Sequence, residues 1–186
     1  MRIKYNSPTV LTYTLISVVV LILSQTILRG LAESWFMVPG RETFSPRRIS
    51  HWFSLLTHVA GHENWTHLLS NFSLILLIGP ILEENYGSRS LFMMIVITAL
   101  VTGTLNALFF RTALMGASGV VFMMILLASF TNFTRGEIPL TFILVLVLYL
   151  GRELFSAFSS NNISEFAHIA GGFCGSLFGF FRLPKQ

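Results

Sequence analysis

A serine and a histidine stand in apolar stretches of the chain, where polar side chains are costly and often functional. Ser118 lies in a Gly-Ala-Ser-Gly sequence at residues 116–119, and His168 is the only histidine in the last third of the chain. A serine hydroxyl that gives its proton to a histidine becomes a nucleophile for acyl transfer. None of the eight acidic residues is an aspartate, so a Ser-His-Asp triad within the chain is excluded. The pair would act as a dyad or with a glutamate.

Both residues also have structural interpretations. A small-residue sequence in a membrane helix is commonly a packing site, and serine is a frequent N-cap. A histidine there can serve packing alone by hydrogen-bonding to another helix. The chemical interpretation has its own support, because Gly116 and Gly119 permit a tight turn and close approach. A serine at the start of a helix also lies beside unpaired backbone N–H groups, which can stabilise an oxyanion.

His67 and Asn71 are four residues apart and share one helical face. Both can donate hydrogen bonds to a developing negative charge, or they can link helices. His58 and His62 have the same spacing and raise the alternative of a metal site. The zinc signature H-E-x-x-H is missing, because valine follows His58 and His67 lies five residues after His62. We therefore expect no metal and no other cofactor.

The elements that position these side chains are expected to be membrane helices. The 186 residues are 53% hydrophobic and only 11% charged, with a mean hydropathy of +0.72, whereas soluble domains carry about 25% charged residues. The sequence therefore predicts an integral membrane protein with one domain, residues 1–186. Its net charge of +4 comes from scattered basic residues, which suit anionic lipids and do not indicate nucleic-acid binding. The single cysteine, Cys174, is expected to pack rather than react.

An all-α bundle of six spans is predicted, because a bilayer crossing needs about 20 apolar residues. The six apolar segments are residues 10–28, 66–82, 90–110, 118–134, 138–158 and 163–181. Six spans place both termini on one side. The twelve arginines and lysines divide six against six between the two sides, but the short loops favour termini in the cytoplasm, because the outer basic residues are concentrated in one long loop. Residues 29–65 hold all three tryptophans and are expected to form a structured loop with short helices in the outer interface. His51 is expected to be a loop residue there.

His67, Ser118 and His168 lie near the starts of the second, fourth and sixth spans. Because these spans run in the same direction, the three side chains are expected at one depth, in the outer part of the bilayer. The sixth span also carries a stripe of small residues that permits close helix packing, formed by Ala167, Gly171, Gly175 and Gly179. If the stripe faces the fourth span, the His168 imidazole can reach the Ser118 hydroxyl.

These residues, in this order, resemble the rhomboid intramembrane serine proteases in their basic six-helix, bacterial form. Four family signatures are matched over roughly residues 45–180: H-x4-H-x3-N at His62, His67 and Asn71; E-x3-G-S at Glu83, Gly87 and Ser88; GxSG at Gly116, Ser118 and Gly119; and H-x2-G-x3-G at His168, Gly171 and Gly175. Two positions depart from the family. Phe53-Ser54 replaces a common Trp-Arg pair, and Phe122 stands where some members have tyrosine.

The resemblance implies a six-helix rhomboid-like bundle that cleaves transmembrane segments of membrane-protein substrates. Ser118 would be the nucleophile and His168 the general base. Apart from the resemblance, Glu165 is considered as a residue that orients His168, because it lies three residues before it. His67, Asn71 and the Ser118 backbone N–H would form the oxyanion hole. The remaining implied roles are close packing by Gly116, Gly119, Gly171 and Gly175, and cavity lining by His62 and Phe122.

The resemblance further implies a membrane-embedded first loop at residues 29–65 and a location in the bacterial cytoplasmic membrane, with substrates arriving from the lipid. Two other functions stay open. A non-proteolytic rhomboid-like protein that binds membrane clients typically lacks the serine or the histidine, and both are present here. A small transporter or channel is disfavoured by the single polar cluster and by the absence of paired acids within the spans.

Overall fold

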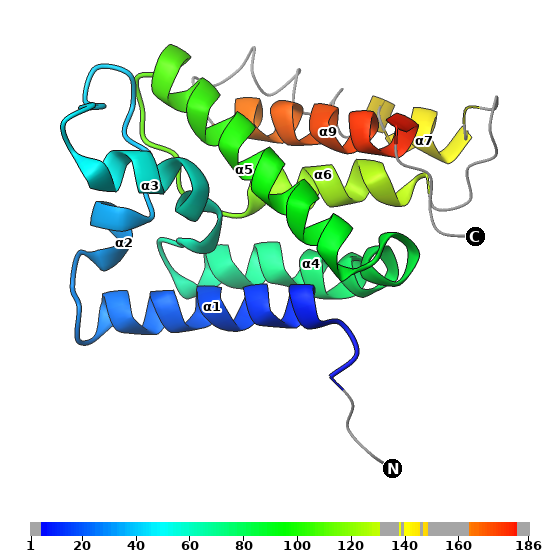
Figure 1. The fold of residues 1–186 in the computed structure, drawn as a ribbon, viewed down its shortest axis with the longest axis horizontal. Coiled ribbons are helices and arrows are strands. Elements are labelled where there is room, and N and C mark those ends of the chain that lie inside the picture. Colours follow the sequence, from blue (N-terminus) through cyan, green and yellow to red (C-terminus); the bar gives the residue numbers. More distant parts are fainter. Residues whose placement is uncertain (1–4, 131–137, 139, 146, 149–163, 182–186) are drawn as a thin grey trace.

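The computed structural model describes residues 5–130, 138, 140–145, 147–148 and 164–181. Within these ranges every regular element is a helix (Figure 1), which confirms the predicted all-α class. The elements are α1 (Pro8–Gln25), α2 (Leu31–Trp35), α3 (Ile49–Thr57), the 3-10 turn η1 (His58–Ala60), α4 (Trp65–Tyr86), α5 (Ser88–Phe109), α6 (Ser118–Ala128), α7 (Leu140–Val145) and α9 (Ser164–Phe181).

Among the described residues, α1, α4 and α5 are long and apolar enough to cross a membrane, and α6 and α9 provide shorter apolar helices. The chain is therefore an integral membrane protein. The fourth span was expected to reach residue 134, but α6 ends at Ala128, because Ser129 and Phe130 bond to carbonyls three residues earlier and tighten the last turn. The predicted fifth span is described only in part, at α7. The count of six spans stays a prediction.

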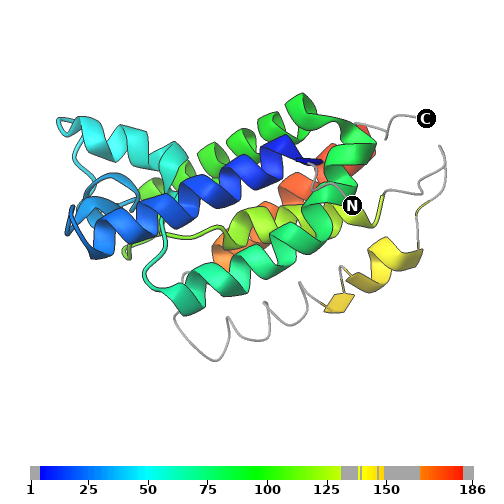
Figure 2. The ribbon, with the colours of Figure 1, turned by 90° about the horizontal axis from the view of Figure 1, so that it is seen from below.

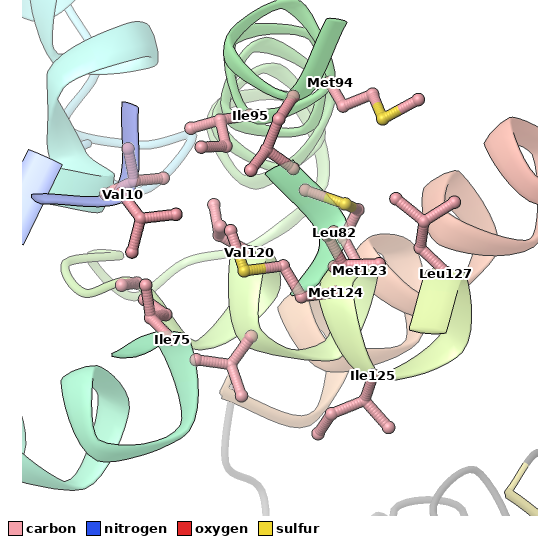
Figure 3. Close-up of a cluster of buried hydrophobic side chains, with 14 of the residues drawn as sticks. Val10, Ile75, Leu82, Met94, Ile95, Val120, Met123, Met124, Ile125 and Leu127 are labelled. Carbon is pink, nitrogen blue, oxygen red and sulfur yellow. The ribbon is translucent and has the colours of Figure 1, made fainter. Parts of the chain in front are cut away.

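Helix α6 lies in the interior of the bundle, packed against α4, α5 and α9 (Figures 1 and 2). Every residue from 119 to 127 is buried, as expected for a helix that is apolar on all sides. Side chains from α1, α4 and α5 meet α6 in one core (Figure 3), which includes Val10, Ile75, Leu82, Met94, Ile95, Val120, Met123 and Met124. The core thus fixes the helix that begins with Ser118.

Glu83 fastens the start of α1 to the end of α4. Its two carboxylate oxygens accept hydrogen bonds from the backbone N–H groups of Thr9, at 2.8 Å, and Val10, at 3.0 Å. These donors have no partner within α1 because they lie in its first turn. Gly79, one turn before Glu83, lets Val10 approach, since a Cβ at Gly79 would lie 2.7 Å from a Val10 methyl group. The matched E-x3-G-S signature therefore has a structural role here.

The segment between α1 and α4 is structured, as predicted, and contains α2, α3 and η1. Its tryptophans, Trp35 and Trp52, are each about half exposed, as is Trp65 at the start of α4, which suits side chains at a membrane interface. The expectation that His51 is a loop residue was wrong. His51 lies in α3 and is buried, and its Nδ1 accepts a hydrogen bond of 2.9 Å from the Ser45 backbone N–H.

The connection from α5 to Ser118 is hydrogen-bonded to the first loop. Val38 and Leu114 form an antiparallel bridge with two hydrogen bonds of 2.9 Å. The Gly116 N–H donates to the carbonyl of His58 at 3.0 Å. The first loop therefore positions the backbone that leads into Ser118, although the two segments are distant in the sequence.

Candidate functional site

Helices α4, α6 and α9 run in the same direction, and their starts lie at the end of the bundle that carries α2 and α3 (Figure 1). His67 is the third residue of α4, Ser118 the first residue of α6 and His168 the fifth residue of α9. The three residues therefore belong to neighbouring helix starts, as the order of the spans predicts.

Gly116 brings the His67 ring against the backbone that precedes Ser118. Its φ of +129° is a conformation that side chains disfavour. A Cβ at this position would lie 2.7 Å from both Cε1 and Nε2 of His67, and 3.9 Å from the Asn71 amide nitrogen. Two residues of the predicted oxyanion hole thus lie beside the turn into α6, and both the conformation and the space there require glycine.

His62, His67 and Asn71 form one polar cluster. The N-cap Asn64 accepts a hydrogen bond of 2.9 Å from the His67 backbone N–H, which sets the start of α4. The Asn71 amide nitrogen lies 3.2 Å from His62 Nε2 and 3.2 Å from the His67 carbonyl oxygen. Because an amide nitrogen only donates, Nε2 of His62 accepts and the His62 proton resides on Nδ1. His62 therefore holds the Asn71 amide in position.

His58 and His62, which precede α4, are held as neutral groups. Burial lowers the pKa of His58 to about 4, and burial with the nearby His67 lowers the pKa of His62 to about 4. His58 Nε2 lies 3.2 Å from the Thr102 hydroxyl, whereas His62 Nε2 meets Asn71. In the part of the chain that the structure describes, no three His, Cys, Asp or Glu side chains are grouped to bind a metal.

His168 stacks on Phe122, with ring centroids 4.2 Å apart and an interplanar angle of 5°. Phe122 is four residues after Ser118 and therefore lies on the same face of α6. The imidazole thus lies over the α6 face that carries Ser118. The side chain of Glu165, considered as a partner for His168, is outside the described part.

The small residues of α9 pack directly on the α6 backbone, so the stripe faces the fourth predicted span. A Cβ at Gly171 would lie 2.0 Å from the carbonyl oxygen of Gly119, and a Cβ at Gly175 would lie 2.2 Å from that of Met123. Buried Ala167 borders Gly119 through its carbonyl oxygen. The two backbones are therefore in contact beside the candidate site.

A cavity of about 280 Å³ adjoins His67, and its lining residues are Glu33, Met37, Glu63, His67, Ala113 and Met115. His62 and Phe122, which were expected to line a cavity, are 1% and 8% exposed and do not line this one. Sequence reasoning missed its two carboxylates. Glu63 directly follows His62 of the H-x4-H-x3-N signature, and this position could have marked it as a candidate site residue. Nothing in the sequence pattern marks Glu33.

Comparison with known proteins identifies relatives over most of the chain. A sequence profile of the Rhomboid domain matches residues 50–185. Rhomboid protease GlpG of Haemophilus influenzae is 26% identical over 128 residues, which cover 67% of each chain. Two Arabidopsis thaliana proteins are also similar. Rhomboid-like protein 11, chloroplastic, is 24% identical over 82% of this chain and 52% of its own length. RHOMBOID-like protein 4 is 32% identical over 67% of this chain and 32% of its own.

Proposed function

Because this chain belongs to the rhomboid family, we propose that it is an intramembrane serine endopeptidase with Ser118 as nucleophile and His168 as general base. The observation that carries the proposal is that His67 and His168 both lie around the start of α6, the helix that begins with Ser118. The His67 ring adjoins Gly116, just before Ser118, and His168 stacks on Phe122, one turn after it. A nucleophile, a base and oxyanion donors thereby share one helix end.

The oxyanion hole would consist of the His67 Nε2–H, the Asn71 amide and the Ser118 backbone N–H. As the first residue of α6, Ser118 has an N–H without an intrahelical acceptor. The aligned peptide dipoles of α6 add positive potential at the same place. Such preorganised donors stabilise the negative charge that develops on the carbonyl oxygen in the transition state.

The reaction follows the pattern of acyl transfer. Ser118 Oγ attacks the scissile carbonyl carbon while His168 accepts the hydroxyl proton. The tetrahedral intermediate collapses, the peptide C–N bond breaks, and the leaving amine takes the proton from His168. Water then attacks the acyl-enzyme, gives its proton to His168 and releases the carboxylate product with Ser118 restored. The chemistry requires no metal or other cofactor.

The depth of the site implies a substrate that enters from the lipid. Helix α6 has 11 residues and is roughly 16 Å long, about half of a bilayer core of ~30 Å. We place Ser118 below the outer surface, with both termini in the cytoplasm of a bacterial cell. A transmembrane substrate docking beside α4 and the fifth span must unwind locally, because a helical carbonyl is already hydrogen-bonded. Water would reach Ser118 from the outer side of the membrane.

Cleavage by the purified protein tests the proposal. In detergent, wild-type protein is expected to cut a model transmembrane substrate, and Ser118→Ala and His168→Ala are expected to reduce the rate to background. Ser73→Ala is the matched control, because Ser73 is an exposed serine on α4 that bonds only locally. Cleavage that survives Ser118→Ala contradicts the dyad. Binding of the substrate by wild-type protein without any cleavage would instead support the client-binding alternative.

A further inference from the structure

The cavity beside His67 carries two carboxylates that the proposed reaction does not use. We infer that this cavity receives a cationic substrate side chain, lysine or arginine, close to the scissile bond. The inference rests on the proposed function, because it assigns the substrate preference of the same site.

The shape and chemistry of the lining match such a side chain. Glu33 on α2 and Glu63 just before α4 contribute the carboxylates, while Met37 and Met115 contribute apolar surface. Lysine and arginine combine an apolar stem with a charged head, and they place the stem on apolar surface while the head stays near water. The methionines can receive the stem, and the carboxylates can receive the head.

Both carboxylates are available for a ligand. Glu33 and Glu63 are exposed, and neither forms an ion pair with any described residue. The ion pairs in the described part join Glu42 to Arg41, at 3.8 Å, and to Arg111, at 2.9 Å. Two unneutralised carboxylates in one hollow concentrate negative potential there. The cavity therefore favours a cation over a neutral side chain of the same length.

The cavity is also adjacent to the proposed chemistry. His67 lines it, and the same imidazole lies against Gly116, two residues before Ser118. Met115, another lining residue, is three residues before Ser118. A side chain in the cavity thus belongs to a substrate residue near the scissile bond. Because α2 of the first loop forms part of the wall, the cation would sit at the outer interface, where lysine and arginine of membrane proteins are tolerated.

The competing explanation is that Glu33 and Glu63 only make the outer surface soluble. Substrate pairs that differ by a single lysine or glutamine, placed in turn at each position within four residues of the mapped cleavage site, separate the two explanations. Wild-type protein is expected to favour lysine in kcat/KM at one position. Glu33→Gln and Glu63→Gln are each expected to reduce that preference by up to about fivefold, the range of partly exposed ion pairs. High salt is expected to reduce it as well.

Glu84→Gln is the matched control, because Glu84 is an exposed glutamate near the opposite end of α4. It is expected to leave the lysine preference unchanged. Charge reversal gives a second readout, since Glu63→Lys is expected to favour glutamate at the same substrate position. Equal cleavage of lysine and glutamine substrates at every position, or a preference that both glutamine variants retain, overturns the inference. Cleavage that still requires Ser118 would leave the proposed function standing.

Binding tests the cavity without catalysis. Fluorescently labelled lysine and glutamine substrates are titrated with the Ser118→Ala protein, and their anisotropy gives the dissociation constants. The lysine substrate is expected to bind more tightly, with the difference reduced when Glu63→Gln is added. Equal affinities overturn the inference. A lysine preference in binding, combined with absence of cleavage by wild-type protein, would contradict the proposed protease and not the cationic subsite.

Discussion

At the scale of single residues, the site depends on how each polar side chain is held. Asn71 contacts both His62 and His67. Gly116 has no Cβ and therefore leaves room for the His67 ring beside the turn into α6. His62 is buried beneath this arrangement, at 1% exposure. Its imidazole therefore acts through Asn71, as a positioning group for the proposed oxyanion hole.

Replacement of Asn71 tests the oxyanion hole. Asn71→Ala is expected to lower kcat by about 10²–10³, with a smaller effect on KM, because the lost donor serves the transition state more than the bound substrate. Steady-state cleavage of a model substrate measures both constants. A kcat within a factor of two of wild type would remove Asn71 from the proposed mechanism.

The candidate site residues could be found from the sequence because their types are unusual within apolar segments. Ser118 and His168 stand out for that reason, and the spacing of His67 and Asn71 is readable without a structure. The hydrogen bond between Asn71 and His62 was not predictable, because it depends on how the turn before α4 folds back. Glu33 lies far from the signatures and approaches His67 only through the tertiary fold.

At the scale of elements, contact between α6 and α9 sets the distance between the proposed nucleophile and base. Gly171 and Gly175 of α9 have no room for a Cβ against the α6 backbone, and Gly179 has none against the Phe130 ring just after α6. The four-residue period of the stripe identified this face, since such spacing keeps residues on one side of a helix. The predicted fourth span ran past the hydrogen bonds that close the last turn of α6, although residues 131, 132 and 134 are polar and already indicate an earlier end.

Gly171→Ala tests the close packing of α9 on α6. The added Cβ would lie 2.0 Å from the carbonyl oxygen of Gly119, so the helices must separate. A displacement of about 1 Å can cost 10²-fold in rate, and a loss of at least that size in kcat/KM is expected, together with a lower Tm. Phe173→Ala is the control, because Phe173 is 61% exposed on the same helix. Wild-type activity in Gly171→Ala would show that the contact does not position His168.

The first loop and the turn before Ser118 form a second pair of elements that the sequence did not link. The bridge between Val38 and Leu114 could not be predicted from the periodicity of the sequence, because it involves only one residue from each segment. The tryptophans still predicted that the loop is structured at the interface. The structure adds that this loop contacts the turn into α6, and so contributes to the site.

At the scale of the whole molecule, the composition of the chain indicated a membrane protein, and the order of its apolar segments indicated where the candidate site residues lie. Apolar segments predicted membrane helices, and their order placed the starts of α4, α6 and α9 at one end of the bundle (Figure 1). The cavity could not be predicted, because its six lining residues come from separate segments that meet only after folding. The count of six spans and the orientation in the membrane stay predictions.

Buried histidines make the stability of the molecule sensitive to acid. The folded pKa of His58 and of His62 is about 4, below the unfolded value of about 6.5. Between these values the unfolded chain binds more protons, so the free energy of unfolding falls as the pH falls from about 6.5 toward 4. The Tm in detergent is expected to drop over this range. A variant carrying His58→Gln and His62→Gln is expected to show a weaker dependence, and identical pH profiles would contradict this origin.

Covalent labelling of the nucleophile tests the central claim most directly. Purified wild-type protein in detergent is treated with a fluorophosphonate probe, digested and mapped by mass spectrometry. The proposed dyad predicts a single major adduct on Ser118, strongly reduced by His168→Ala and unaffected by Ser73→Ala. Absence of an adduct on Ser118 under conditions where the protein cleaves its substrate, or equal labelling with and without His168, would contradict the Ser118–His168 mechanism.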